Sequence, residues 1–471
     1  MRSIFIFCAF LSFFVLGVSA PFLMALGYVW TDMVRPQSLV YMAALKVVPY
    51  SFIIAIACMV GYLAIDRRSP PRIGIVAVLT VMFAVWVTLT TTWAVVPDWA
   101  WWMWDWAIKS LVFAVFIPFV IRTRNQIEAF LQVYIFSLGT TIIPFGAKVF
   151  LSGGGYGRKL GLISANTALG EQIALSSVSL AIIPIIYYLS KNGRIFPNTP
   201  LFKFGYLGFG FAALLTALGT YERTALVGLA VLMLGAWLQT RKKMAVGALF
   251  FALLAVGAYA SADKWAERMS TITDFKNEPS ANVRLLVWAW TLDFARTHPF
   301  GGGFESYRVN SIVVPLAPET IAKIQQTLSP KAIQELQDND EDPFIRNEHG
   351  RAFHSVYFEL LGEHGWPGLF LFCAIMGGTL ISLQISKRRA RRIPELAWLV
   401  DLASALQLGL WILLACGGFV NYAFYPYMYY MAGLGMSVRE YVYRVQSRMP
   451  GAQAGALPKF QVRPVAAETG I

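Results

Sequence analysis

Long apolar runs alternate with short polar segments over almost the whole chain. Several runs exceed the roughly 18 to 20 residues that a helix needs to cross a bilayer. In hydrocarbon the backbone polar groups of a spanning segment must be satisfied internally, and a helix does this. The pattern predicts about twelve spans, each a helix. They lie near residues 4–29, 42–65, 73–94, 107–121, 127–151, 168–190, 203–219, 223–240, 244–261, 355–383, 397–416 and 420–438.

One long polar stretch, residues 262–354, interrupts this pattern. Within it, residues 280–304 predict one amphipathic helix that ends at Pro299 and a glycine turn. Residues 317–343 predict two short helices separated by Pro330. The chain is therefore expected to be an all-α polytopic membrane protein with a single large helical loop.

Composition supports this class. Hydrophobic residues make up 57% of the chain and charged residues 14%, whereas a soluble domain has about 25% charged residues. The net charge of +13 does not indicate a nucleic-acid partner, because the basic residues lie mostly in short loops between apolar runs. The four cysteines all fall in predicted spans without a CxxC pair, so we expect them to pack as small apolar residues.

The loops differ in charge in an alternating way. The segments "DRRSPPR", "RTRN", "KNGR", "TRKK" and "SKRRARR" are basic, whereas residues 92–106 and 417–430 contain no lysine or arginine. The positive-inside rule assigns the first set, and with it both termini, to the cytoplasm. Residues 262–354 then lie outside. The aromatic clusters at 93–106 and 422–430 are expected to form interfacial belts.

The chain ends also carry information. "MRSIFIFCAFLSFFVLGVSA" has the features of a signal peptide, but the apolar run continues through "PFLMALGYVW", which favours an uncleaved first span over a cleaved one. Residues after Met449 are rich in Ala, Gly, Pro and Gln and predict a disordered tail. We divide the chain into an N-terminal membrane region (1–199), a membrane core that includes the loop (200–440) and a cytoplasmic tail (441–471).

Four cationic residues at three places lie on the outer side, against the charge rule. Arg223 begins a span, where a cation opposes the helix dipole unless an anion binds between it and the free helix N–H groups. The alternatives are snorkelling to the interface or pairing with Glu222. Arg158 and Lys159 follow "SGGGYG", which is either a phosphate cradle or an ordinary polar loop. Arg284, at the start of the loop helix, is on its own an ordinary solvated charge.

All four histidines fall within residues 298–364: His298, His349, His354 and His364. Their spacing does not place ligands on one helical face, and no HxxxH or HExxH arrangement occurs. We therefore predict neither a metal site nor another cofactor. We expect His349 to line the approach to a site, and His364 to pack inside a span beside Gly365 and Pro367.

His354 lies where the loop becomes a membrane helix, and a histidine there can act as a base or as a hydrogen-bond donor. The alternative is a histidine that serves only as a polar group at the membrane interface. Ser355 and Glu359 are four residues apart and share one helical face. Glu359 lies about one turn inside the span, where an ionisable residue is costly and is a functional candidate by default.

These features together resemble a known family. An arginine at the start of a span precedes "VRLLVWAWTLDFARTHPFGGGFESY" and "HSVYFELLGEHGWPGLFLF". This arrangement resembles the O-antigen ligase and O-antigen polymerase superfamily, which includes bacterial oligosaccharyltransferases that O-glycosylate proteins. "GLISANTALGEQIAL" (161–175) is similar to an upstream family element. The front of the chain, with "GYVWTDMVRPQSLVYM", resembles O-glycosylation ligases associated with exosortase systems.

The resemblance implies a glycosyltransferase of the bacterial inner membrane with about twelve spans and a periplasmic loop. It implies transfer of a glycan from undecaprenyl diphosphate to an acceptor hydroxyl on lipid A core, protein or glycan, without metal. Arg223, Arg284 and His354 match the family's functional residues. Many members have asparagine where this chain has Ser355, which weakens inference about acceptor positioning.

We further expect substrate contacts from Arg158, Lys159, His349, Ser355 and Glu359. A polysaccharide polymerase would present the same reacting groups and is the main alternative. A transporter of lipid-linked saccharide is less favoured, because the two halves show no repeat.

Overall fold

A computed structural model describes residues 2–66, 68–152, 169, 172–240, 243–244, 247–248, 279–315, 318–329, 334 and 344–448. Its elements are α1 (Arg2–Gly17), α2 (Pro21–Val34), α3 (Pro36–Leu39), α4 (Ala43–Lys46), α5 (Tyr50–Ile65), α6 (Ile75–Thr92), α7 (Pro97–Val120), α8 (Arg124–Leu151), α9 (Gln172–Asn192), α10 (Pro200–Gly219), α11 (Arg223–Gln239), α14 (Pro279–Thr297), β1 (Ser311–Pro315), α15 (Pro318–Thr327), β2 (Ile345–His349), α17 (Val356–Ala390), α18 (Ala397–Cys416) and α19 (Pro426–Ser447). Short 3-10 helices cover Ser306–Val309, Pro394–Leu396 and Gly417–Phe419.

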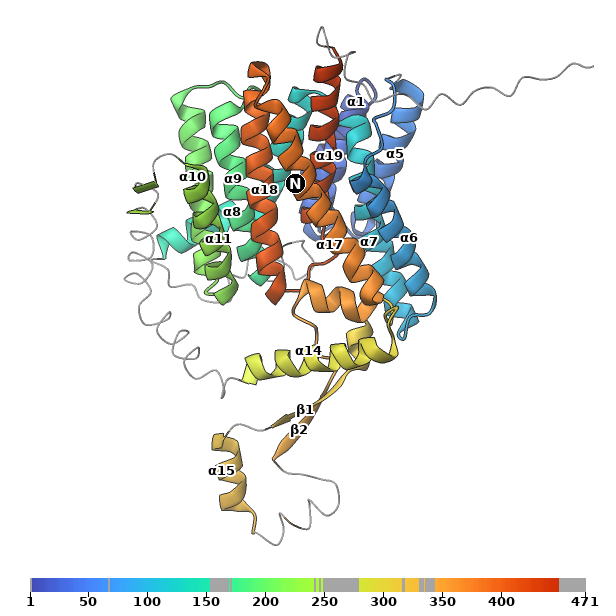
Figure 1. The fold of residues 1–471 in the computed structure, drawn as a ribbon, viewed down its shortest axis with the longest axis vertical. Helices are drawn as coiled ribbons and strands as arrows, with labels where there is room; N and C mark the ends of the chain where they lie inside the picture. Colours follow the sequence, from blue (N-terminus) through green and yellow to red (C-terminus); the bar gives the residue numbers. More distant parts are fainter. Residues whose placement is uncertain are drawn as a thin grey trace, which may run out of the picture.

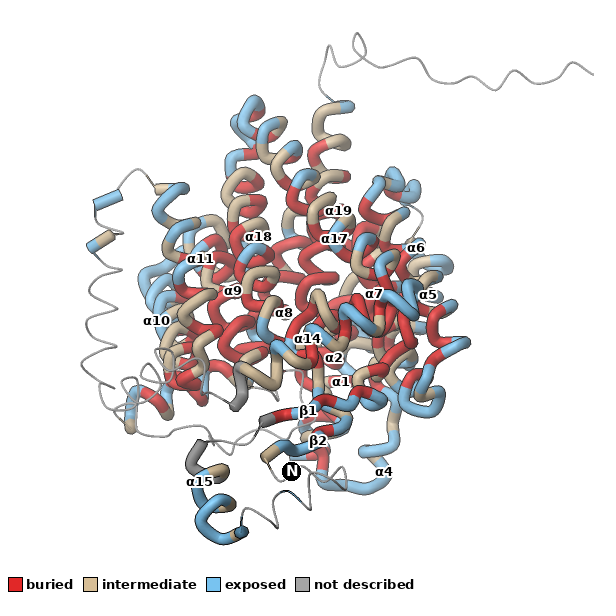
Figure 2. The backbone as a smooth tube through the Cα atoms, turned by 60° about the horizontal axis from the view of Figure 1, so that its bottom comes forward, coloured by how far each residue is buried: buried red, intermediate tan, exposed pale blue. Residues whose placement is uncertain are grey.

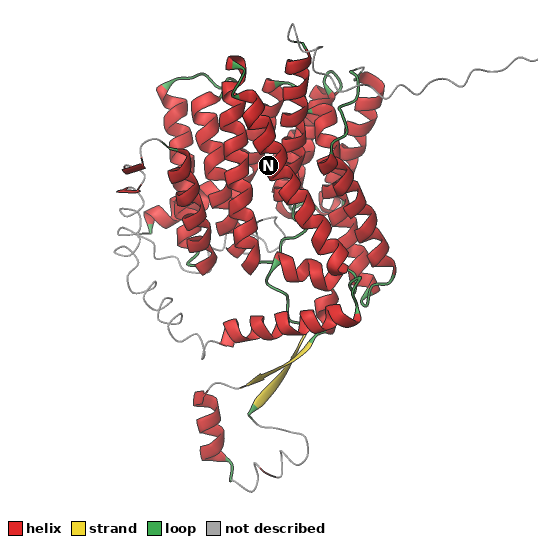
Figure 3. Ribbon diagram, in the orientation of Figure 1, coloured by secondary structure: helices red, strands yellow, loops and turns green. Residues whose placement is uncertain are grey.

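The long helices stand side by side in one bundle, and α14 lies across one end of it (Figure 1). We call this end the α14 end. Beyond α14, β1 and β2 pair antiparallel, with Ser311 opposite His349 and Pro315 opposite Ile345 (Figure 3). The described part of the chain is thus mostly helical, as predicted, with one two-stranded sheet that the sequence pattern did not predict.

A small second core holds α14 and the hairpin in place. Val287 from α14 packs with Ile312 and Val314 from β1 and with Phe353, which precedes α17. Burying these side chains stabilises the arrangement by roughly 1.5–3 kcal/mol each. The predicted loop helix therefore exists and ends at Thr297, two residues before Pro299. The second predicted loop helix, after Pro330, falls almost entirely outside the described residues.

The number of spans differs from the prediction. Among the described residues, seven helices are long and apolar enough to cross a membrane, and three shorter apolar helices (α1, α5 and α11) accompany them. The count of about twelve is therefore not confirmed. The predicted span 244–261 falls largely outside the described residues. The predicted span 107–121 is extended, because α7 begins at Pro97 and includes most of the tryptophan-rich segment.

The predicted first span, 4–29, is wrong. It is two helices, α1 and α2, because the chain turns at Ala20 and Pro21 and the proline starts the second helix. Arg2 and Ser3 then lie against Tyr41, with hydrogen bonds of 2.9 and 2.8 Å. Tyr41 precedes α5, so the start of the chain lies at the end of the bundle where α5 begins. Arg72 follows α5 and contacts Glu440 near the end of α19, so α19 ends where α5 ends. The two ends of the described chain therefore lie at opposite ends of the bundle, which differs from the expectation that both termini share one side.

The aromatic cluster at 422–430 is not an interfacial belt. Tyr422, Tyr427, Tyr429 and Tyr430 are all fully buried among the central helices, where Figure 2 shows buried residues concentrated. In the cluster at 93–106, by contrast, Trp93, Trp99, Trp101 and Trp102 are exposed, as an interfacial position requires.

Candidate functional site

The connection between α18 and α19, residues 417–425, fastens the start of α17. The backbone N–H of Ser355 donates to Oδ1 of Asn421 at 3.0 Å. The backbone N–H of Ala423 donates to the Glu359 carboxylate at 3.1 Å. Ser355 and Glu359 are both buried, and Ser355 occupies the N-cap of α17 without a side-chain capping bond. These two bonds fix the backbone position of His354, which immediately precedes Ser355.

The start of α11 meets the same end of α18. Arg223 is the first residue of α11, as predicted. The carbonyl of its neighbour Thr224 accepts a weak hydrogen bond from Sγ of Cys416 at 3.6 Å. Gly417, which follows Cys416, packs so closely on α17 that a Cβ there would lie 3.2 Å from the side chain of Val356. The helix starts that carry Arg223 and His354 therefore both adjoin the end of α18.

The loop helix α14 is tied to the residues before α17. Nε1 of Trp288 donates to the carbonyl of Phe353 at 2.8 Å, and the Trp288 ring stacks on Phe358 with centroids 4.8 Å apart. Arg284 is four residues before Trp288 and so lies on the same face of α14. This face is the one that meets His354, so two candidates distant in sequence are neighbours in space.

The environment of His354 suits a neutral imidazole. Partial desolvation by the surrounding protein, and after it the charges of Arg284 and Arg351, lower the pKa of His354 below its ordinary value. The side chain nevertheless remains accessible at the surface. A neutral, accessible imidazole can accept a proton at neutral pH.

The backbone of His354 is strained. Its φ of 49° lies in the left-handed region, which side chains other than glycine seldom adopt. Strained residues of this kind persist only where the surrounding structure fixes them, and they cluster at functional sites. Here the bonds at Phe353 and Ser355, on either side of His354, supply the fixation.

The turn before His354 is held by Asn310, the residue that directly precedes β1. Nδ2 of Asn310 donates to the carbonyl of Arg351 at 2.6 Å, and the N–H of Arg351 donates to Oδ1 of Asn310 at 2.9 Å. The Arg351 guanidinium pairs with Glu348 at 2.5 Å, and Arg346 pairs with the same carboxylate. These partners, Arg351 first, lower the pKa of Glu348. Arg351 therefore keeps a fixed positive charge near the imidazole of His354.

The remaining three histidines lie in three different surroundings. His349 is exposed in β2 at the edge of the hairpin. His298 is exposed and stacks on Phe294, with ring centroids 4.2 Å apart. His364 is completely buried in α17, where its Nδ1 lies 2.7 Å from Oγ1 of Thr90. The prediction that His364 packs inside the span is confirmed.

The turn after α14 (residues 298–303) and the kink in α17 at Gly365 are hydrogen-bonded to each other, and we call this arrangement the paired turn. Gly365 has a φ of 66° and interrupts the helical backbone, which leaves carbonyls of the preceding turn available. The N–H groups of Gly302 and Gly303 donate to the carbonyls of Gly362 and Glu363 at 2.9 and 2.7 Å. In return, the N–H of Trp366 donates to the carbonyl of Pro299 at 3.0 Å. The glycine-rich segments of the two motifs thus bind each other.

The structure brings together part of the predicted site. Arg284, His354, Ser355 and Glu359 lie around the start of α17. The start of α11, which carries Arg223, adjoins the neighbouring end of α18. Arg158 and Lys159 lie outside the described residues. Four further residues that position His354 or act on it were not predicted: Trp288, Asn310, Arg351 and Asn421. One sequence feature could have indicated Asn421, because it is the single amide side chain within the aromatic segment 417–430.

Comparison with known families agrees with this arrangement. Residues 208–373 match the O-antigen ligase family, which confirms the resemblance inferred from the loop motifs over this part of the chain. Residues 1–194 match a family of unknown function. No curated protein matches the chain. The matched ligase segment contains Arg223, Arg284 and His354, the three residues that we single out.

Proposed function

We propose that this protein is a metal-independent glycan ligase of the bacterial inner membrane. It transfers a saccharide from an undecaprenyl-diphosphate-linked donor to an acceptor hydroxyl on the periplasmic side, which is the α14 end of the bundle. The ligase family match supports glycan transfer in general. The donor, the acceptor and the side of the membrane are part of our proposal.

The proposal rests mainly on the surroundings of His354. It is an accessible imidazole with a lowered pKa, on a strained backbone, beside the loop helix that carries Arg284. Such a group suits a reaction that must take a proton from an alcohol beside a polyanionic leaving group.

The chemistry assigns one role to each residue. The acceptor oxygen attacks the anomeric carbon and forms the new glycosidic bond, while the bond between that carbon and the phosphate oxygen breaks. The acceptor proton moves to the neutral nitrogen of His354. The bonding electrons leave with the lipid diphosphate, whose charge Arg223 and Arg284 stabilise through planar guanidinium groups. We expect inversion at the anomeric carbon, because one displacement without a covalent enzyme intermediate inverts it.

One experiment separates this proposal from its alternatives. The purified full-length protein is incubated with an undecaprenyl-diphosphate-linked glycan and, in separate reactions, with lipid A core, a hydroxyl-bearing protein or further lipid-linked glycan. Mass spectrometry follows both the product and the released undecaprenyl diphosphate. Release coupled to transfer onto core or protein is the expected result. Elongation of the lipid-linked glycan alone would make the protein a polymerase. Absence of release with every acceptor, by a protein shown to be folded, would contradict the proposal.

A further inference from the structure

A second polar feature lies far from this site, at the opposite end of the bundle. A cavity of about 570 Å³ opens between α6, α7, α17 and α19. Its lining includes Arg72 in the segment before α6, Ile75 at the start of α6, Phe119 at the end of α7 and Arg389 at the end of α17. Since α17 begins at the α14 end, this cavity is nearly the full length of that helix away from His354. It belongs to the end that carries the basic loops.

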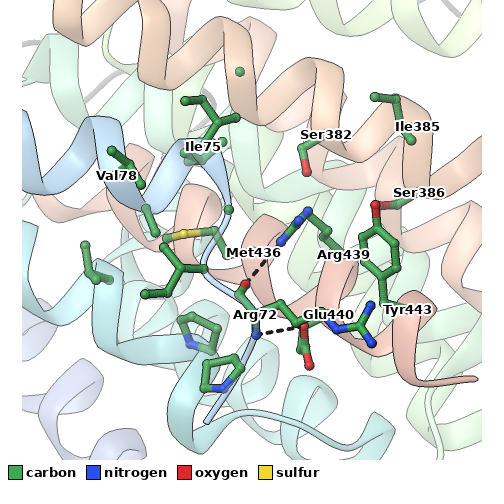
Figure 4. Close-up of a pocket in the computed structure, with 18 of the residues that line it drawn as sticks. Arg72, Ile75, Val78, Ser382, Ile385, Ser386, Met436, Arg439, Glu440 and Tyr443 are labelled. Carbon is green, nitrogen blue, oxygen red and sulfur yellow. Dashed lines mark hydrogen bonds between the residues drawn. The ribbon is translucent and has the colours of Figure 1, made fainter. Parts of the chain in front are cut away.

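Three arginines converge on one ring at the mouth of the cavity. The guanidinium carbons of Arg72, Arg389 and Arg439 lie 5.6, 4.6 and 5.0 Å from the centroid of Tyr443. Figure 4 shows Arg439 and Tyr443 side by side, with the Arg439 guanidinium donating to the carbonyl of Arg72 at 3.2 Å. Like charges this close repel one another, so an anion between them would be stabilising.

The protein itself compensates little of this charge. Glu440 is the one carboxylate in the described lining of the cavity. Its two oxygens accept from the backbone N–H of Arg72 at 3.2 Å and from the side chain of Arg444 at 2.9 Å. Gly74 leaves room for the Arg439 guanidinium, because a Cβ there would lie 2.7 Å from its terminal nitrogen. The cluster therefore has a net positive charge and a defined shape.

The rest of the cavity is apolar and open. Ile75, Val78 and Ile381 line it and remain exposed. At Val81 and Val115 the cavity adjoins a second hollow of about 340 Å³ between α6 and α7, which reaches Leu89. From Ile75 to Leu89 the groove follows α6 for about 21 Å. This length exceeds half of the roughly 30 Å hydrocarbon core of a bilayer.

We propose that this cavity binds an anionic phospholipid. Its phosphate lies among Arg72, Arg389 and Arg439, and one acyl chain lies in the groove between α6 and α7. Guanidinium forks match phosphate oxygens, and basic pockets between membrane helices bind anionic headgroups. A free phosphate would satisfy the arginines but leave the adjoining apolar groove unfilled. Because the arginine cluster and the apolar groove form one continuous cavity, the site favours a lipid, which has both a phosphate and an acyl chain.

Native mass spectrometry of the purified full-length protein tests this proposal. The ligands are phosphatidylglycerol, phosphatidylcholine and glycerol phosphate. The double variant Arg389→Gln/Arg439→Gln removes charge from the cavity, and Arg388→Gln is the matched control, because Arg388 is exposed on the same helix end outside the lining. Val81→Trp obstructs the groove at a position that is already half exposed. Thermal unfolding shows that each variant is folded.

We expect phosphatidylglycerol to bind at least tenfold more tightly than phosphatidylcholine. The double variant should lose roughly 25-fold of that affinity, about fivefold per arginine, while Arg388→Gln stays within twofold of the wild type. Val81→Trp should also weaken phosphatidylglycerol binding. Equal affinity for the two lipids, an equal loss in Arg388→Gln, or glycerol phosphate binding as tight as phosphatidylglycerol would overturn the proposal. None of these results depends on glycan transfer.

Discussion

The N–H of Ser355 donates to Oδ1 of Asn421 at 3.0 Å, and this bond joins the start of α17 to the connection between α18 and α19. The two residues are 66 positions apart. Because Ser355 follows His354 directly, the bond fixes the backbone from which the imidazole projects.

Asn421→Ala should therefore reduce transfer about tenfold, since one lost hydrogen bond corresponds to roughly 1–1.5 kcal/mol. Asn421→Asp keeps an acceptor oxygen and should restore most of the rate. Transfer assays with both variants, together with thermal unfolding, check this prediction. An alanine variant with full activity, or an aspartate variant as impaired as the alanine one, would argue against a positioning role for Asn421.

The rate of transfer should depend on pH through His354. Because the surroundings lower the pKa of His354, the imidazole is neutral at neutral pH and becomes charged only below its ordinary value of about 6.5. Activity should thus be constant near neutrality and fall as the pH decreases through this lowered pKa. The measurement is a profile of transfer rate against pH, with donor stability controlled.

Arg351→Gln should move that acid limb to higher pH. Removing a positive charge near His354 favours its protonated form and raises its pKa. Arg346→Gln is the matched control, because Arg346 pairs with the same Glu348 but is not among the charges that act on His354. An unchanged limb in Arg351→Gln, or an equal shift in both variants, would show that Arg351 does not set the pKa of His354.

Two glycines of α17 should respond oppositely to alanine. Gly365 has a positive φ, and a Cβ there would lie 2.2 Å from the carbonyl oxygen of Pro299. Gly365→Ala should lower the free energy of unfolding by about 1–3 kcal/mol or more. Gly377 has open space at its Cβ, so Gly377→Ala should be neutral or stabilising by up to roughly 1 kcal/mol. Thermal unfolding in detergent compares the two, and equal midpoints would contradict the paired-turn description.

The sequence was most informative where local rules act. The loop helix was predicted to end at Pro299 and the glycines after it, and α14 ends at Thr297. Arg223 was predicted to begin a helix, and it is the first residue of α11. Caps and breakers act over a few residues and can therefore be recognised locally.

It was least informative where an apolar residue had two possible surroundings. Tyr429 and Tyr430 were predicted to lie at the membrane interface but are buried between helices. Lipid is as apolar as a protein core, so hydropathy does not separate lipid-facing from buried positions. The hairpin was missed because "SIVVP" and "IRNEH" are short and pair across a long connection. Asn421 was missed because its partner, Ser355, is distant in the sequence.

We propose that His354 accepts the proton of the acceptor hydroxyl during glycan transfer. The most direct measurement compares transfer rates of wild type, His354→Ala and His298→Ala with the same lipid-linked donor and acceptor. His298 is the matched control, because it is exposed on the end of α14 and stacks on Phe294. A base contributes about 10²–10⁴-fold to rate, so His354→Ala should lose at least 100-fold while folded and His298→Ala should stay within about threefold. Transfer by folded His354→Ala at the wild-type rate would show that His354 is not the base.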